Sequence, residues 1–176
     1  MLRTAIILSL AMLFGASQCT TTESTTSTTA VKTSFVSSDS LDFPDKVEKI
    51  KKTDAEWKAE LSDLDYNVLR EHGTERAFTG SLLNNKKKGV YTCKACNLPL
   101  FASDTKFKSG TGWPSFWQPI DKKYVGETVD KSYGMVRTEV HCNRCDGHLG
   151  HVFDDGPNPT GLRYCINSVS LNFVEQ

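Results

Sequence analysis

One cysteine near the C-terminus, Cys165, has the features of a catalytic nucleophile. It lies in the segment GLRYCINS, residues 161–168. Of the six cysteines, four form Cys-x-x-Cys pairs and Cys19 lies near the N-terminus, so Cys165 is the one thiol left in the folded region. If residues 162–171 form a strand, Arg163, Cys165 and Asn167 share one face. Arginine beside a thiol favours the reactive thiolate, although an inert cysteine buried on a strand would look the same.

Two histidines three residues apart, His148 and His151, are candidates for proton transfer. Imidazole titrates near neutral pH and is the commonest general acid or base in enzymes. Such a pair also occurs as metal ligands or as ordinary polar core residues. The residues alone leave these roles open, and the pair strengthens the case for a reactive Cys165.

The remaining four cysteines predict a structural zinc site. They form two knuckles, at Cys93 and Cys96 and at Cys142 and Cys145. Two knuckles of this kind supply the four thiolates of a closed tetrahedral zinc shell, which leaves no position for a substrate. The alternative is a pair of disulfides, which an exported protein could form. We expect one zinc ion per chain, clamping two distant segments together.

A glycine-rich loop that ends in aromatic residues is the third candidate element. Residues 110–117 read GTGWPSFW. Such a loop can form a small apolar box around Trp113, although by composition alone core packing is the commoner outcome. The sequence leaves both open.

The chain also predicts a three-part organisation. An apolar run at 5–14 after Arg3 is too short to span a bilayer comfortably and indicates an export signal over residues 1–19. Cys19 then resembles a lipoprotein acceptor site, or lies by chance beside ordinary signal cleavage. Residues 20–44 are rich in Thr and Ser and indicate a flexible linker. The domain is expected at 45–176.

Net charge zero over 176 residues gives no indication of nucleic-acid binding, and the lysine run at 86–88 is interpreted as a solvated loop. Capping patterns at Thr53 and Ser62 predict two short helices, the second ending near Gly73.

The core contacts expected from these helices are Trp57, Leu61, Leu64 and Leu69. After Gly89 the pattern changes to short strands separated by turns. The strand candidates are 90–92, 98–101, 135–140, 151–153 and 162–173. The predicted fold class is mainly β, antiparallel, with a small helical preface.

Taken together, these motifs resemble one family, the B-type methionine sulfoxide reductases. The matching stretches are 73–75, 89–93 with Cys96, 106–107, 109–116, 142–145, 147–153 and 161–168. The resemblance implies two antiparallel sheets curved around each other. It implies that Cys165 is the catalytic cysteine, with Arg163, His148, His151 and Asn167 as its neighbours. It also implies that Trp113 receives the substrate's methyl group, and we assign Phe153 to the substrate site with it.

The same resemblance implies the reaction and its partners. The substrate would be methionine-R-sulfoxide in oxidised proteins, and the Cys165 thiolate would become a sulfenic acid. Many family members carry a resolving cysteine where this chain has Thr111, so the cycle is expected to be completed by a thioredoxin-like protein, a small thiol, or a thiol outside the domain such as Cys19. The alternative function is a non-catalytic, zinc-stabilised binding module. We expect the protein to be exported, with Cys19 as a possible membrane tether.

Overall fold

The computed structural model describes residues 41–176. The predicted export signal, Cys19 and most of the predicted linker lie outside the described residues. Within residues 41–176, no helix has the length and apolar character needed to cross a membrane.

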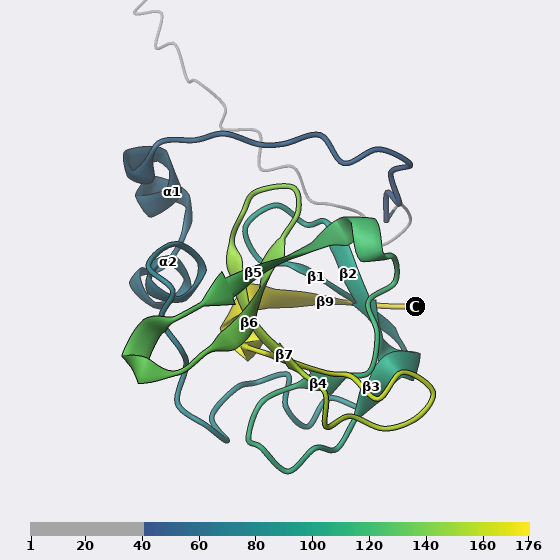
Figure 1. Ribbon diagram of the computed structural model, residues 1–176. Helices are drawn as coiled ribbons and strands as arrows, with labels where there is room; N and C mark the ends of the chain where they lie inside the picture. The colour runs from purple at the N-terminus through teal and green to yellow at the C-terminus, as the bar shows by residue number, and fades with distance from the viewer. Residues whose placement is uncertain (1–40) are drawn as a thin grey trace, which may run out of the picture. The chain divides into compact units, whose positions relative to one another are not determined.

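The described chain begins with two short helices, as the capping patterns predict. Helix α1 spans Asp54–Glu60 and has a complete capping box between Thr53 and Glu56. Helix α2 spans Asp63–Arg70, with Ser62 accepting a hydrogen bond from the Asp65 amide. Figure 1 shows the two helices together beside the sheets.

Two details of the helix prediction are wrong. Leu64 is exposed, whereas Trp57 and Leu69 are buried. Helix α2 ends at Arg70, before Gly73, and the left-handed residue that follows it is His72, with φ 57°. The Gly73 amide still donates to the Asn67 carbonyl at 3.0 Å, which returns the chain toward the helix.

The strands form two antiparallel sheets, which confirms the predicted fold class. The smaller sheet has the order β2 (Pro99–Ala102), β1 (Gly89–Cys93), β9 (Leu171–Glu175). The larger has the order β3 (Lys106–Phe107), β4 (Ser115–Phe116), β8 (Arg163–Ile166), β7 (His148–Phe153), β6 (Arg137–Cys142), β5 (Val125–Asp130). Short 3₁₀ turns lie at 103–105, 122–124, 132–134 and 168–170. Strands β3, β4 and β5 were not expected from the sequence.

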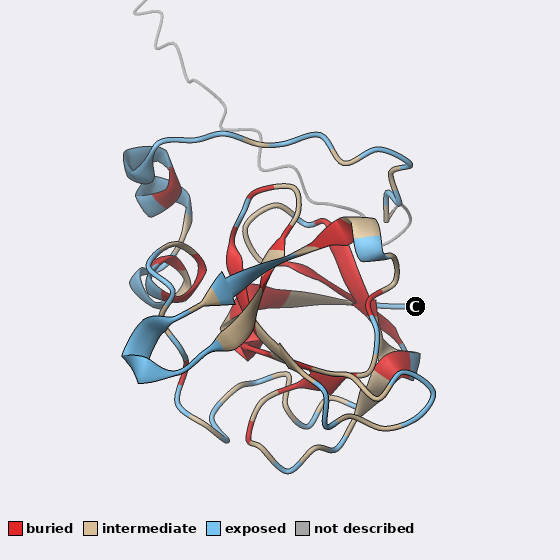
Figure 2. Ribbon diagram, in the orientation of Figure 1, coloured by how far each residue is buried: buried red, intermediate tan, exposed pale blue. Residues whose placement is uncertain are grey.

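The core lies between the two sheets, where Figure 2 shows most of the buried residues. Phe101 of the small sheet stacks on Phe116 of the large one, with ring centroids 4.5 Å apart. Tyr91 meets the same Phe116 edge-on at 5.0 Å. Large buried aromatic rings of this kind contribute most of a small domain's packing energy. They also fix β4 against β1 and β2, and β4 is the strand that pairs with Cys165.

The segment predicted as one strand over 162–173 is two strands in different sheets. Strand β8 ends at Ile166, the chain turns at Ser168–Ser170, and β9 pairs with β1 in the small sheet. The turn is held by the buried Glu75 carboxylate, which accepts hydrogen bonds from the Ser168 and Val169 amides. This partner lies about ninety residues away in the chain, so the strand pattern could not reveal the break.

Candidate active site

Strand β8 presents Cys165 on the face that points away from the core. Tyr164 and Ile166 are buried in the core, while Arg163 and Cys165 on the opposite face are partly exposed. Across the ladder, His151 of β7 lies directly opposite Cys165, and Ser115 of β4 lies opposite it on the other side. The period of two in a strand therefore brings the thiol and an imidazole together on one face.

A cavity of about 120 Å³ opens at this position. Its lining combines the thiol with one imidazole, one guanidinium and two aromatic rings; the residues are Thr74, Trp113, Arg137, Gly150, His151, Phe153, Cys165 and Asn167. The sequence predicted five of these eight, Cys165, His151, Trp113, Phe153 and Asn167. Gly150 allows the close approach of β7 and β8, because a β-carbon there would lie 2.1 Å from the Cys165 carbonyl oxygen.

The loop of Trp113 is fixed beside the thiol by backbone and side-chain contacts. The indole Nε1 donates to the Glu75 carbonyl at 3.1 Å, and the Pro114 carbonyl accepts from the Ile166 amide at 2.9 Å. Gly112 has φ +97°, a left-handed conformation that favours glycine, and a β-carbon there would press on Ala77. As a result Thr111 Oγ1 lies 3.6 Å from Cys165 Sγ.

Glu75 is buried and connects the parts of the site. Its amide donates to Asn167 Oδ1 at 3.1 Å, its carbonyl holds Trp113, and its carboxylate holds the turn after β8. Burial raises the pKa of Glu75, against the two backbone hydrogen bonds that favour the carboxylate. Asn167 is equally engaged, since its Nδ2 donates to the Leu149 carbonyl at 3.0 Å. These two residues position the nucleophile strand and the indole relative to each other.

His151 is held by a carboxylate that the sequence analysis missed. Its Nε2 lies 2.8 Å from Asp130 Oδ2. Hydrogen bonds from Ser132, and then from His151 and Arg137, hold the pKa of Asp130 well below its usual range. Because Asp130 is ionised it must accept, so Nε2 is the donor and Nδ1 is the nitrogen left for other chemistry. Arg137 binds the same carboxylate at 2.6 Å and also lines the cavity.

His148 is almost fully buried, at 2% exposure. Burial lowers the pKa of His148, although its contact with Glu139 acts in the opposite direction. Its Nδ1 lies 2.7 Å from Glu139 Oε1, and its ring centroid is 5.5 Å from that of His151. Within the described residues its Nε2 is buried without a hydrogen-bond partner. His148 therefore adjoins His151 but does not line the cavity.

His72, which was not predicted to belong to the site, contacts the same carboxylate. Its Nδ1 lies 3.0 Å from Glu139 Oε1. Burial acts to raise the pKa of Glu139, but its contacts with His148, Thr128 and His72 together leave the pKa lowered. The three residues form a second group close enough to hold a metal ion. The hydrogen bond of His148 and the close contact of His72, both with Glu139 Oε1, account for their arrangement without one.

Arg163 is on the predicted face but is committed to another partner. Its Nε and Nη2 form a bidentate pair with Asp155 at 2.8 and 2.9 Å, and its guanidinium lies 4.3 Å from the Phe153 ring centroid. The contact with Asp155, and to a smaller extent the neighbouring Cys165, raises the pKa of Arg163. The cation that lines the cavity is Arg137, which the sequence did not single out.

The four remaining cysteines of the described chain converge, as predicted. Their sulfur atoms all lie within 4.8 Å of one another, with Cys93 and Cys145 3.6 Å apart and Cys96 and Cys142 3.5 Å apart. A tetrahedral shell with zinc–sulfur bonds of about 2.3 Å places the sulfurs about 3.8 Å apart. All four are free thiols, whereas a disulfide needs about 2.05 Å. The donor set therefore fits a metal ion such as zinc.

The two knuckles have the same local structure. Cys93 ends β1 and Cys142 ends β6, and each carbonyl accepts from the amide four residues on, at Asn97 and Asp146. Asn97 and Asp146 are both left-handed, with φ 57° and 56°, which Asn and Asp tolerate best among residues with side chains. Since β1 and β6 belong to different sheets, the cluster joins the two sheets.

Electrostatics of the cluster also favour a bound cation. The neighbouring sulfurs, Cys142 first among them, together with burial, raise the pKa of the Cys93 thiol. Four thiolates cannot share one buried space unless a positive charge compensates them. A divalent ion bound by the four sulfurs would supply that charge, and its binding would be coupled to folding.

Fold and site together define a two-sheet β domain with a four-cysteine cluster and a separate thiol-and-imidazole cavity. Comparison with known proteins identifies the class. The family described as "SelR domain" matches residues 61–175. "Peptide methionine sulfoxide reductase MsrB" of Thiobacillus denitrificans is 61% identical over 122 residues, which cover 69% of this chain and 92% of that protein.

Two further relatives carry the same name. The protein of Methanosarcina barkeri is 61% identical over 70% of this chain and 87% of its own length, and that of Hahella chejuensis is 57% identical over 72% and 91%. The chain belongs to the SelR-domain family of B-type methionine sulfoxide reductases, which confirms the resemblance drawn from the motifs.

Proposed function

We propose that this protein reduces methionine-R-sulfoxide in oxidised proteins to methionine, with Cys165 as the nucleophile. The observation that carries the proposal is the cavity in which Cys165 lies opposite His151 and beside Trp113. The relatives' shared name, peptide methionine sulfoxide reductase, supports the same activity. A binding module without catalysis would have no use for a thiol placed opposite an imidazole in a cavity.

The chemistry follows from the sulfoxide group. Its sulfur is electrophilic, but its oxygen leaves only when protonated. The Cys165 thiolate attacks the sulfur while His151, supported by His148, donates a proton to the oxygen. The sulfur–oxygen bond breaks and the oxygen leaves as water. Water then attacks the Cys165 sulfur and breaks its bond to the methionine sulfur, so that methionine leaves with the electron pair and Cys165 ends as the sulfenic acid, two electrons more oxidised. Arg137 lines the cavity and Arg163 lies beside the thiol, each paired with a carboxylate, Asp130 and Asp155 respectively.

Asp130 and Glu139 act through the histidines. Each carboxylate accepts a hydrogen bond from an imidazole and so fixes which ring nitrogen carries its proton. Asn167 and Glu75 hold strand β8 and the Trp113 indole in place relative to each other. Phe153, in the cavity wall, contributes apolar surface for the substrate side chain.

Trp113 is proposed to select the R epimer by receiving the substrate's methyl group. An activity assay with each separate sulfoxide epimer, with dithiothreitol as reductant, tests both the function and this role. We expect the wild type to reduce only the R epimer. Trp113→Ala should raise KM and lower the R-over-S ratio by about tenfold or more, the scale on which an apolar pocket discriminates. Trp117→Ala, outside the cavity, is the control. An unchanged R-over-S ratio in Trp113→Ala would show that Trp113 does not receive the methyl group.

Recycling of Cys165 is proposed to need an external thiol, from a thioredoxin-like protein or a small-molecule reductant. One thiol condenses with the sulfenic acid to give a mixed disulfide and water, and a second thiol releases Cys165. The cysteines 93, 96, 142 and 145 are held together in their own cluster, and the side chain that contacts the Cys165 sulfur from the Trp113 loop is Thr111, which carries no thiol.

That contact between Thr111 and Cys165 gives a direct test. In a Thr111→Cys variant, made with Cys19→Ser to remove the other thiol, one turnover without reductant should leave a disulfide between residues 111 and 165. Side chains already 3.6 Å apart satisfy the proximity that a disulfide requires. Peptide mapping by mass spectrometry reports the linkage, and a dimedone-type probe should label Cys165 when Thr111 is kept. A disulfide from Cys165 to a knuckle cysteine would contradict the scheme.

The remaining proposals concern the metal and the location. Cys93, Cys96, Cys142 and Cys145 would hold one structural zinc ion, which supplies cross-linking and no step of the reaction. The protein acts outside the cytoplasm after export through residues 1–19, and a lipid on Cys19 would tether it to a membrane. Its partners are oxidised proteins and a thiol reductant, and no nucleic acid is involved.

A further inference from the structure

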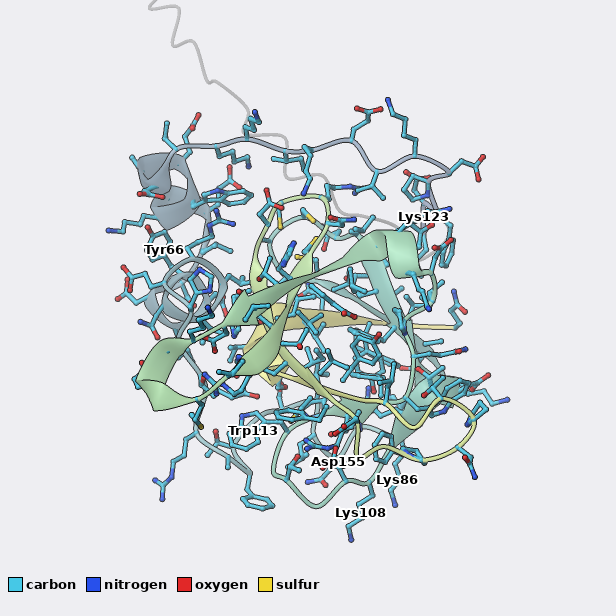
Figure 3. The ribbon with its side chains drawn as sticks, in the orientation of Figure 1. Tyr66, Lys86, Lys108, Trp113, Lys123 and Asp155 are labelled. Carbon is cyan, nitrogen blue, oxygen red and sulfur yellow. The ribbon has the colours of Figure 1, made fainter. Side chains whose placement is uncertain are left out.

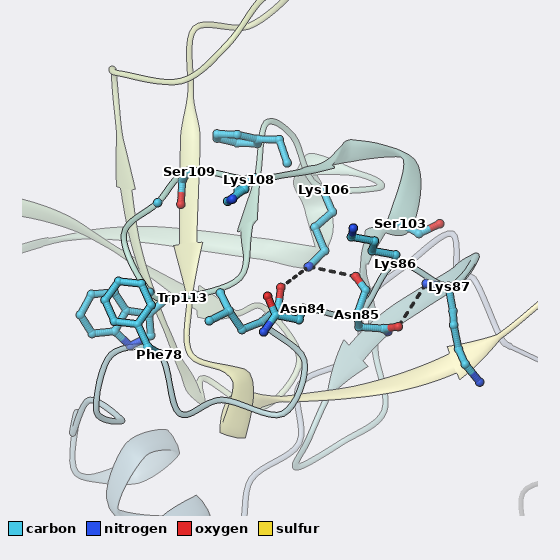
Figure 4. Close-up of a pocket in the computed structure, with 14 residues that line it drawn as sticks. Phe78, Asn84, Asn85, Lys86, Lys87, Ser103, Lys106, Lys108, Ser109 and Trp113 are labelled. Carbon is cyan, nitrogen blue, oxygen red and sulfur yellow. Dashed lines mark hydrogen bonds between the residues drawn. The ribbon is translucent and has the colours of Figure 1, made fainter.

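A second, larger hollow adjoins the proposed catalytic cavity at a shared tryptophan. Its volume is about 520 Å³, and Trp113 lines both spaces. Phe78, Leu83 and Phe107 give it apolar walls. Figure 4 shows Phe78 against Trp113 at one end and Asn85 with Lys106 toward the other.

The charged side chains that line this hollow are all positive. Lysines 86, 87, 106 and 108 are among its lining residues, and no Asp or Glu of the described residues is. Lys106 is used internally, since its Nζ donates to the carbonyls of Leu83 and Asn85 at 2.7 and 3.1 Å. Lys87 pairs with Glu175 at 2.6 Å and points away from the hollow in Figure 4.

Two cations therefore remain for a ligand. Lys86 and Lys108 are exposed, and neither forms an ion pair with any of residues 41–176. Figure 3 places both along the same edge of the molecule as Trp113. An apolar hollow with two unpaired ammonium groups fits a chain that brings one carboxylate and some apolar surface.

From this continuity and charge, we infer that the hollow binds the polypeptide beside the methionine sulfoxide and prefers an acidic side chain there. The inference rests on the proposed function. A substrate whose sulfoxide side chain enters the cavity at Cys165 can extend its backbone past Trp113 into the hollow, because that ring lines both spaces. An extended chain advances about 3.3 Å per residue, so a residue close to the sulfoxide in sequence enters the hollow. Lys86 and Lys108 would then meet its carboxylate.

The test uses the full-length protein, dithiothreitol and a series of short, otherwise neutral peptides with one methionine-R-sulfoxide. A single glutamate is moved position by position along both flanks, and each peptide has a glutamine counterpart of the same shape. We expect glutamate to raise kcat/KM by about three- to tenfold over glutamine at one or two positions on one side only. That is the scale of two exposed charge pairs, and it should shrink at high salt.

The variant Lys86→Glu/Lys108→Glu should remove or reverse the glutamate preference. Its matched control is Lys51→Glu/Lys122→Glu, which changes the net charge equally at two exposed lysines outside the hollow. Both variants should reduce N-acetyl-methionine-R-sulfoxide amide, which has no flanking residues, at the wild-type rate.

Each failure has a distinct reading. If the wild type does not reduce the amide, the proposed function falls. If it does, but glutamate gives no position-dependent advantage or the control variant loses that advantage equally, the inference about the hollow is wrong and the proposed function stands. A third arm replaces dithiothreitol by a thioredoxin-type protein. If Lys86→Glu/Lys108→Glu raises only the KM for that protein and leaves the peptide series unchanged, the hollow would be assigned to the reductant and the inference overturned.

Discussion

Replacing Cys165 by serine should lower kcat/KM for methionine-R-sulfoxide by about 10³-fold or more, the usual scale when a nucleophile is removed. A serine hydroxyl is hardly ionised at neutral pH and attacks sulfur far less readily than a thiolate. His151 and Trp113 would remain in place, so the loss would belong to the nucleophile alone. The assay measures initial rates with dithiothreitol on the separated R epimer.

Stability is the control for this variant. Cys165 lies on the partly exposed face of β8, and serine has nearly the same size, so the free energy of unfolding should change by about 0.5 kcal/mol or less. Thermal unfolding of both proteins checks this. Retention of more than about a tenth of the wild-type rate by a properly folded variant would show that Cys165 is not the nucleophile.

Removing the metal should unfold the domain. The four-cysteine cluster joins β1 of the small sheet to β6 of the large one, and the binding of a structural zinc ion contributes about 10–16 kcal/mol. That equals or exceeds the whole stability of a typical domain, about 5–15 kcal/mol. Elemental analysis should find one zinc per chain, and a strong chelator or Cys93→Ser should abolish the cooperative unfolding transition seen by circular dichroism.

Cys165→Ser serves as the matched cysteine control, because that residue lies outside the cluster and should leave the zinc content unchanged. The zinc proposal would be overturned by a metal-free protein of undiminished stability. Disulfides between Cys93 and Cys96 and between Cys142 and Cys145, found by mass spectrometry, would support the alternative that the sequence left open.

The residue types that carry chemistry were visible in the sequence because each is local and distinctive. Two Cys-x-x-Cys pairs predict four converging thiols, because two such knuckles together supply the four ligands of one zinc ion. The capping box at Thr53 predicts the start of α1 for a similar reason, because its hydrogen bonds run between residues three apart. A period of two placed Arg163 and Cys165 on one face, and the structure has them there.

What only the tertiary structure decided is how these groups are held. Asp130 and Glu139 lie in polar strands that look like ordinary surface, and only the pairing of β6 with β5 and β7 brings them to His151 and His148. Glu75, far from Cys165 in sequence, ends β8 and anchors Trp113. Contacts between distant segments leave no periodic trace in the chain, because a carboxylate's partner depends on which strands are neighbours, and the folded core alone determines that.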